Sequence, residues 1–344
     1  MLNIIVMTQV SYQFPTHFDC RESTYPDEYI KDVKEYVKES SEFLNHKKTP
    51  VLDLSTLGLG FVVNNFLTKN YEHIMTLNVS RNNIKTLNTM LNHYPNIQEL
   101  DFSNNCLISL NIEHRKLVMN RALVNINFSN NLIKDIHPFF FSSLSLEFID
   151  LSNNRLTRFF AANYDINQLL LLNNQISQIV IDAEHRKELR LLDASHNLVR
   201  IVQANVDFET LLLKNNRVQL DDYFEIRNVR TLDLSQNHID NFNWQIMSYI
   251  TNLNLSLNRL TTISGWCSKR LRYPRVEKLN LNGNAFCHFD NVVNITYCLP
   301  NLKFISLLNN KFNTKTQEVV KSMITSMNVK SQLYDNDFQT LWSN

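Results

Sequence analysis

Apolar side chains recur along the middle of the chain in one fixed spacing. The pattern apolar-x-x-apolar-x-apolar-x-x-Asn-x-apolar covers residues 146–156 and returns over 166–176 and 189–199. Its central part alternates apolar and other positions, which is the periodicity of a short strand with one buried face. Each copy therefore predicts a short strand, followed by a turn that contains the asparagine.

The asparagine of this pattern marks a long series of copies. They stand 19–26 residues apart, at Asn82, Asn105, Asn131, Asn154, Asn174, Asn197, Asn216, Asn237, Asn258, Asn284 and Asn310. A degenerate first copy over residues 51–59 has Leu57 where the asparagine belongs, a common departure in a terminal repeat. Stacked repeats of this length predict a curved α/β solenoid with a parallel sheet on its concave side.

Helical patterns flank the repeats on both sides. Their apolar stripes are Ile30, Val33, Val37 and Leu44 in the first helix, and Val319, Val320, Met323 and Ile324 in the second. Because a terminal repeat would otherwise expose an open apolar edge, both helices are predicted to be caps. The expected organisation is an N-terminal segment and cap over 1–49, about twelve repeats over 50–312, and a cap and tail over 313–344.

The asparagine of each repeat has a mechanical role in this interpretation. Its amide both donates and accepts hydrogen bonds, so it can satisfy turn backbone groups that would otherwise be buried without partners. The asparagines are therefore expected to stabilise the repeats and to bind no ligand.

Outward-facing strand positions are the candidate binding surface. Most repeats place Asp or Asn, and then Ser, at two of these positions, but two repeats have leucine or lysine there. Apolar residues rimmed by polar ones on a strand face are typical of a protein-contact patch, with sequence drift or cover by a neighbouring loop as the alternative. The candidate partner-binding residues are Phe148, Leu170, Leu172, Arg190, Leu191, Leu212 and Lys214.

Composition argues against several classes of function. The net charge of +1 provides no overall field for nucleic acid or an acidic membrane surface, and no apolar run approaches the roughly 18 residues of a membrane-spanning helix. The sequence has 4 glycines, too few for most phosphate-binding loops, and no metal-ligand or catalytic motif. We therefore expect a protein that is not an enzyme, has no catalytic residues, binds no metal or cofactor, and inserts in no membrane.

The 5 cysteines form an odd count, so at least one is a free thiol or pairs with another chain. In an oxidising compartment Cys287–Cys298 is the first choice for a disulfide, because both residues fall in one repeat. Cys106 is expected to be a buried, inert thiol. Cys20 is left to bridge to the N-terminal cap or to a partner chain.

Glycosylation sequons stand at Asn78, Asn127, Asn254 and Asn294. The first three belong to the strand motif itself, so only Asn294 is independent of the repeat. The first ten residues are mildly apolar but lack a basic region, so a truncated signal peptide and an ordinary chain start both remain open.

The chain resembles the extracellular leucine-rich repeat proteins and, more narrowly, the insect leucine-rich immune proteins. The resemblance rests on Asp-Leu-Ser-x-Asn at 150–154 and 233–237, on the uneven repeat lengths, and on Leu-Asn-Gly-Asn-Ala-Phe-Cys-His at 281–288. It implies a secreted scaffold that dimerises and carries a client protein. Members of that group add a cysteine pair and a coiled coil after the repeats, and neither follows the repeats in this sequence.

The sequence as a whole predicts a non-catalytic protein-recognition scaffold. We expect it to be secreted and immune-related, and to bind a partner protein through its concave face, as a homodimer or heterodimer. The alternative is a cytosolic leucine-rich repeat adaptor or regulatory subunit, whose cysteines would all be reduced. Neither interpretation identifies the ligand.

Overall fold

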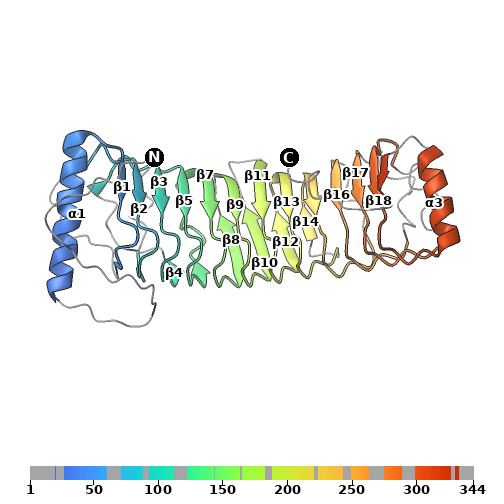
Figure 1. Cartoon of the computed structure of the whole chain (residues 1–344), viewed down its shortest axis with the longest axis horizontal. Helices are drawn as coiled ribbons and strands as arrows, with labels where there is room; N and C mark the ends of the chain where they lie inside the picture. The colour runs from blue at the N-terminus through green and yellow to red at the C-terminus, as the bar shows by residue number, and fades with distance from the viewer. Residues whose placement is uncertain are drawn as a thin grey trace. The chain divides into compact units, whose positions relative to one another are not determined.

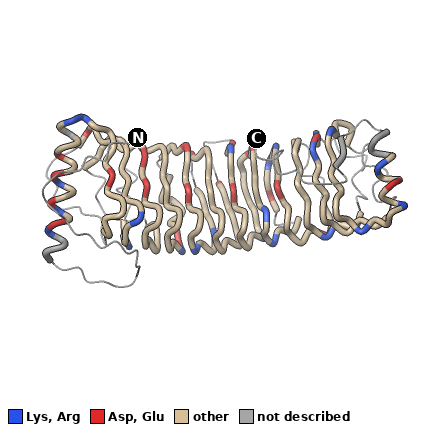
Figure 2. The backbone as a smooth tube through the Cα atoms, viewed as in Figure 1, with Lys and Arg blue, Asp and Glu red and all other residues tan. Residues whose placement is uncertain are grey.

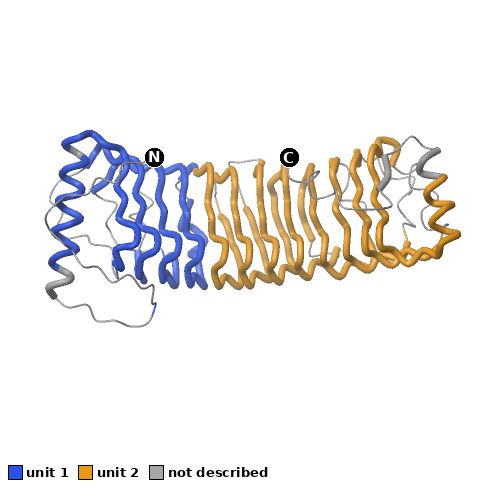
Figure 3. The backbone as a smooth tube through the Cα atoms, in the orientation of Figure 1, with its two compact units in different colours: residues 1–145 blue, residues 146–344 orange. Residues whose placement is uncertain are grey.

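The computed structural model describes residue 20 and residues 27–59, 71–87, 93–111, 122–142, 144–162, 165–182, 188–220, 224–242, 249–262, 275–288, 299–326 and 330–332. The chain forms two compact units, unit 1 over residues 1–145 and unit 2 over residues 146–344 (Figure 3). Each unit is a solenoid in which every repeat contributes one strand to a parallel sheet.

Unit 1 begins with helix α1 (Asp27–Lys47), which lies against strand β1 (Val51–Asp53) (Figure 1). Val33 and Val37 of the predicted apolar stripe are buried. The strands that follow β1 in parallel are β2 (Thr76–Asn78), β3 (Glu99–Asp101) and β5 (Asn125–Asn127). Strands β4 (Ser109–Leu110) and β6 (Asp135–Ile136) form a separate parallel pair.

Unit 2 carries a longer parallel sheet, called the front sheet below. Its strand order follows the sequence: β7 (Ser145–Asp150), β9 (Asp165–Leu170), β11 (Glu188–Asp193), β13 (Asp207–Leu212), β15 (Val229–Asp233), β16 (Asn252–Asn254), β17 (Lys278–Asn280), β18 (Phe304–Ser306) and β19 (Lys330–Gln332). In-register pairing lines up one buried leucine or isoleucine per strand from β9 to β18. These rows of aligned apolar residues form the core, as the repeat pattern predicted.

A second parallel sheet in unit 2, the back sheet, was not predicted from the sequence. It has the order β14-β12-β10-β8 and consists of β8 (Arg158–Ala162), β10 (Gln178–Asp182), β12 (Ile201–Ala204) and β14 (Phe224–Ile226). These strands belong to the shorter repeats, where the returning segment has no room for a helix and runs extended instead. Their Phe159, Ile179, Val202 and Phe224 are buried.

The ladder asparagines are structural, as expected. In Asn174, Nδ2 donates to the carbonyls of Leu151, Leu171 and Leu172 at 3.0, 3.1 and 3.3 Å, and Oδ1 accepts from the amide of Leu156 at 3.0 Å. Asn82 also stabilises the turn of the degenerate first repeat, because its Oδ1 accepts hydrogen bonds from the amides of Leu57 and Leu59. The residue before each ladder asparagine has a positive φ, as at His196 (57°), which explains the frequent asparagine there.

Helix α3 (Thr314–Ser326) follows the last repeat and lies against β19, a strand that the sequence pattern did not indicate. Val320 of this helix is buried, whereas Val319 is 39% exposed. No helix within the described ranges combines the length and the apolar character needed to cross a bilayer.

Candidate partner-binding surface

The candidate partner-binding residues lie on strands of the front sheet or in the turns that follow them. Each of them is at least partly exposed, whereas Ile149, Leu169, Leu192 and Leu211 beside them are buried. The candidates are Phe148 on β7, Leu170 on β9, Arg190 and Leu191 on β11, Leu212 on β13, and Leu172 and Lys214 in the turns after β9 and β13.

Strand register brings several of these residues into rows that run across the strands. Asp193 pairs with Leu170 on one side and with Leu212 on the other, and Leu212 in turn pairs with Asp233. Leucine and aspartate thus alternate over four neighbouring strands. Leu191 lies in a second row and pairs with Gln168 and Thr210, so the leucines of the patch form no continuous apolar strip.

In most repeats the strand ends in an aspartate or asparagine whose side chain caps the turn that follows. Asp150, Asp193 and Asp233 each accept, through Oδ1, a hydrogen bond from the amide of the serine two residues later, at 2.8, 2.9 and 2.8 Å. Asn78, Asp101, Asn127 and Asn254 make the same bond in other repeats.

Leu170 and Leu212 have no acceptor on their side chains, so their repeats lack this cap. A protein hydrogen bond contributes about 0.5–1.5 kcal/mol net. Both repeats therefore forgo a stabilising bond while displaying an apolar side chain to solvent.

Charged residues of both signs occur along the strands of the front sheet (Figure 2). Arg190 on β11 pairs with Glu209 on β13, with 3.6 Å between Nε and Oε2, so the cation that the sequence assigned to the patch already has a partner. Burial raises the pKa of Asp233, and hydrogen bonds from Ser235 and Asn254 and the nearby Lys214 cation partly offset that effect. The described residues contain no cluster of three or more histidine, cysteine or acidic side chains suited to a metal ion.

Three of the four sequons lie on strands whose asparagine has a structural role. Asn78 and Asn127 are half-buried turn caps, and Asn254 is 8% exposed and donates Nδ2 to Oδ2 of Asp233 at 3.1 Å. A glycan attaches to this same amide nitrogen. Asn294 lies outside the described residues, and glycosylation at the four sequons stays a prediction.

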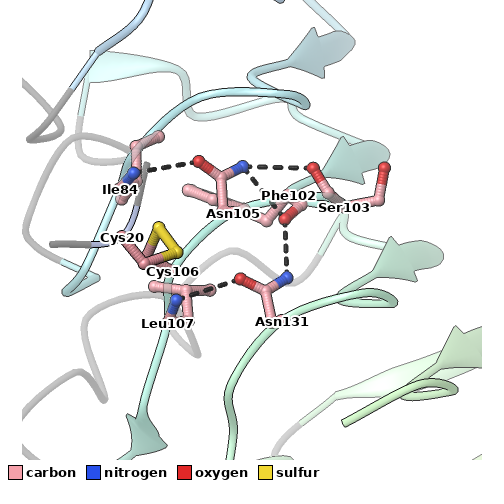
Figure 4. The surroundings of a disulfide bond; sticks show 8 residues. All are labelled: Cys20, Ile84, Phe102, Ser103, Asn105, Cys106, Leu107 and Asn131. Atoms are coloured by element: carbon pink, nitrogen blue, oxygen red, sulfur yellow. Dashed lines mark hydrogen bonds between the residues drawn. A yellow bond between two sulfur atoms is a disulfide. The ribbon is translucent and has the colours of Figure 1, made fainter. Parts of the chain in front are cut away.

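The disulfide prediction needs correction in unit 1. Cys20 and Cys106, separated by 86 positions, form a disulfide with 5.5 Å between their Cα atoms (Figure 4). Cys106 is buried as predicted, but it is not a free thiol, and Cys20 bonds neither to the cap nor to another chain. No local spacing predicts such a contact, because Cys20 and Cys106 are far apart along the chain and are brought together only by the fold.

The predicted Cys287–Cys298 disulfide is not formed in unit 2. Cys287 is a free, partly buried cysteine, and Cys298 lies outside the described residues. Their location in a single repeat was the only basis for that pairing. Proximity along the chain does not ensure the sulfur geometry that a disulfide requires.

Comparisons with known proteins agree with this architecture. A family model described as Leucine Rich Repeat matches residues 145–163. The crystal structure of the leucine-rich repeat domain of APL1B is similar with a TM-score of 0.63 and 20% identity, over 87% of this chain and 94% of that one. The APL1 leucine-rich repeat domain has a TM-score of 0.59 and 18% identity, over 86% and 84%.

One curated protein, the transforming growth factor beta activator LRRC33 of Danio rerio, is 25% identical over 270 residues. The match covers 72% of this chain and 39% of that relative, so the chain spans about two-fifths of the relative's length.

The stacked parallel strands, the asparagine ladder and these similarities define a leucine-rich repeat fold. A further similar structure is the LRIM1/APL1C complex, with a TM-score of 0.53 and 20% identity, over 77% of this chain and 52% of that one. At 18–20% identity this likeness shows the fold of the chain.

Proposed function

We propose that this protein is a non-catalytic recognition scaffold that binds a partner protein through the front sheet of unit 2. The observation that carries the proposal is the pair Leu170 and Leu212. Both side chains are partly exposed, both lie on one face, and both stand where other repeats have a turn-capping side chain. Exposed apolar residues among polar ones are the usual anchors of a protein interface.

We further propose that the protein acts outside the cell and in immunity. The Cys20–Cys106 disulfide supports an oxidising compartment and disfavours the cytosolic adaptor, since cytosolic cysteines are kept reduced. The immune assignment rests on the similarity to APL1 and LRIM1. Pairing with a second leucine-rich repeat chain belongs to the same proposal, because one similar structure is titled as the LRIM1/APL1C complex; sedimentation velocity of the purified protein tests it.

The surface is tested with the double variant Leu170→Asp and Leu212→Asp. Each aspartate restores the residue type found in neighbouring repeats, so the fold should tolerate it, while the apolar contact surface is lost. Wild type and variant are used to capture proteins from the native extracellular fluid, followed by mass spectrometry. We expect the variant to lose the captured partner and to keep the far-UV circular dichroism spectrum of the wild type.

A matched control changes the opposite sheet. Val180→Asp with Ile201→Asp introduces the same charge on the partly exposed positions of β10 and β12. This control should still capture the partner. Capture that survives in the Leu170 and Leu212 double variant would mean that a different surface binds the partner.

A further inference from the structure

Asp193 is a carboxylate with leucine neighbours on both sides. In the sheet register it lies directly between Leu170 on β9 and Leu212 on β13, each about one strand spacing of 4.8 Å away. Leu191 is two residues earlier on the same strand and faces the same way. The carboxylate is therefore partly screened from water by apolar side chains on a surface that is otherwise polar.

The hydrogen bonding of Asp193 leaves acceptor capacity unused. Its Oδ1 accepts from the amide of Ser195 at 2.9 Å, and the described residues provide no bond to the other oxygen. Asp233 in the same row differs: its Oδ1 accepts from the Ser235 amide, its Oδ2 accepts from Asn254, and Lys214 lies nearby. A carboxylate has about four acceptor sites, so Asp193 can take further donors.

Arg190 on this face forms an ion pair with Glu209. The Lys214 cation lies near Asp233 and lowers the pKa of that carboxyl. Among the described residues, Asp193 therefore has no ion-pair partner within this chain. A partner protein that covered the leucines with apolar side chains alone would bury this charge unpaired, at a cost of several kcal/mol.

We propose that Leu170, Asp193 and Leu212 form an anchor site for one basic side chain, arginine or lysine, of the partner protein. The aliphatic stem of such a residue packs along the two leucines, while its cation donates to the free carboxylate oxygen. The leucines contribute apolar contact area, and Asp193 favours a positively charged side chain of the partner over a neutral or negative one. The inference rests on the proposed function, because it takes this face of the front sheet as the binding surface.

The test uses a phage-displayed library of random peptides selected on the intact chain. Each selected peptide is then measured against the wild type, Asp193→Asn and Asp233→Asn. Asparagine retains the Oδ1 cap, as Asn78, Asn127 and Asn254 show in other repeats, so Asp193→Asn removes the charge and keeps the turn. Asp233→Asn removes an equal charge from the same row and is the matched control.

We expect arginine or lysine to be enriched among the peptides that need Leu170 and Leu212. Their affinity should fall on the order of tenfold in Asp193→Asn and change little in Asp233→Asn. Peptides that need the two leucines but contain no basic residue, or that bind Asp193→Asn as tightly as wild type, would overturn the anchor site and leave the proposed function standing. A library that yields no peptide dependent on Leu170 and Leu212 would count against the anchor site and against the proposed function.

Discussion

The ladder asparagines from Asn174 to Asn310 each join two successive repeats through one side chain. The amide of Asn174 reaches the Leu151 carbonyl and the Leu156 amide of the preceding repeat, and the Leu171 carbonyl of its own. Asparagine suits this position because it is short and carries both donors and an acceptor. The buried turn therefore depends on a residue type that no apolar side chain can replace.

Replacing Asn174 with alanine should destabilise the protein. The change leaves the Leu156 amide unpaired and removes one of the two side-chain donors to the Leu151 carbonyl, to which Asn154 still donates. A buried unsatisfied group costs about 1–3 kcal/mol. We expect the free energy of unfolding, measured by urea denaturation, to fall by roughly that amount or more. Gln175→Ala, an exposed amide one residue later, is the control and should change stability by less than about 0.5 kcal/mol. Equal effects of the two changes would argue against a structural role of Asn174.

The raised pKa of Asp233 predicts a specific pH dependence. Burial, its largest cause, raises this pKa from 3.8, so the folded protein holds the proton more tightly than the unfolded chain does. The stability that this carboxyl contributes is therefore present below pH 3.8 and is lost as the pH rises through the raised pKa. Asp233→Asn should gain stability relative to wild type between pH 3 and pH 7, as measured by urea denaturation at both pH values. If the difference in unfolding free energy between Asp233→Asn and wild type were the same at both pH values, burial of the Asp233 charge would have no such effect.

At the scale of elements, the shorter repeats of unit 2 have strands on both of their sheets. The returning segments β8, β10 and β12 pair in register, with Ile179 between Phe159 and Val202. Burial alternates along these segments, for example over residues 178–182, but polarity does not, since Ile179, Val180 and Ile181 are all apolar. Pairing with neighbouring repeats stabilises them as strands.

Helix α3 should act as a cap through one face. Val320 is fully buried and its neighbour Val319 is 39% exposed. We expect Val320→Asp to lower the free energy of unfolding by about 3 kcal/mol or more, because it removes apolar burial and buries a charge. Val319→Asp should change it by less than about 0.5 kcal/mol, since that side chain faces water. Denaturant titration of both variants checks this, and a large loss in Val319→Asp would contradict the assigned face.

At the scale of the whole molecule, the cysteines distinguish the proposed extracellular protein from the cytosolic alternative. With Cys20 and Cys106 joined, at most three of the 5 cysteines are free thiols. Protein from its native source, unfolded without reductant and treated with a thiol reagent, should show three reactive thiols or fewer, and five after reduction. Five reactive thiols before reduction would favour a reducing compartment. Closing a loop of this length should stabilise the fold by about 2–5 kcal/mol.

The two cysteine pairings show where prediction from sequence ends. Phe148, Leu170 and Leu212 are partly exposed, as expected at these strand positions, because alternation along a strand is local. Their role in binding a partner stays a prediction. Sulfur contacts are not local, and so Cys106 was misassigned and Cys287 was paired wrongly. Similarly, the Arg190–Glu209 ion pair depends on which residues of successive repeats lie side by side.

The sequence by itself determined the repeat, the strand and turn of each copy, the buried leucines and the bonding role of the asparagines. All of these follow from side-chain periodicity and hydrogen-bonding capacity within about 25 residues. Only the tertiary structure decided the back sheet, the Cys20–Cys106 bond and the position of Asp193 between Leu170 and Leu212. These features arise between repeats, where the spacing and register of stacked strands bring together residues that are distant along the chain.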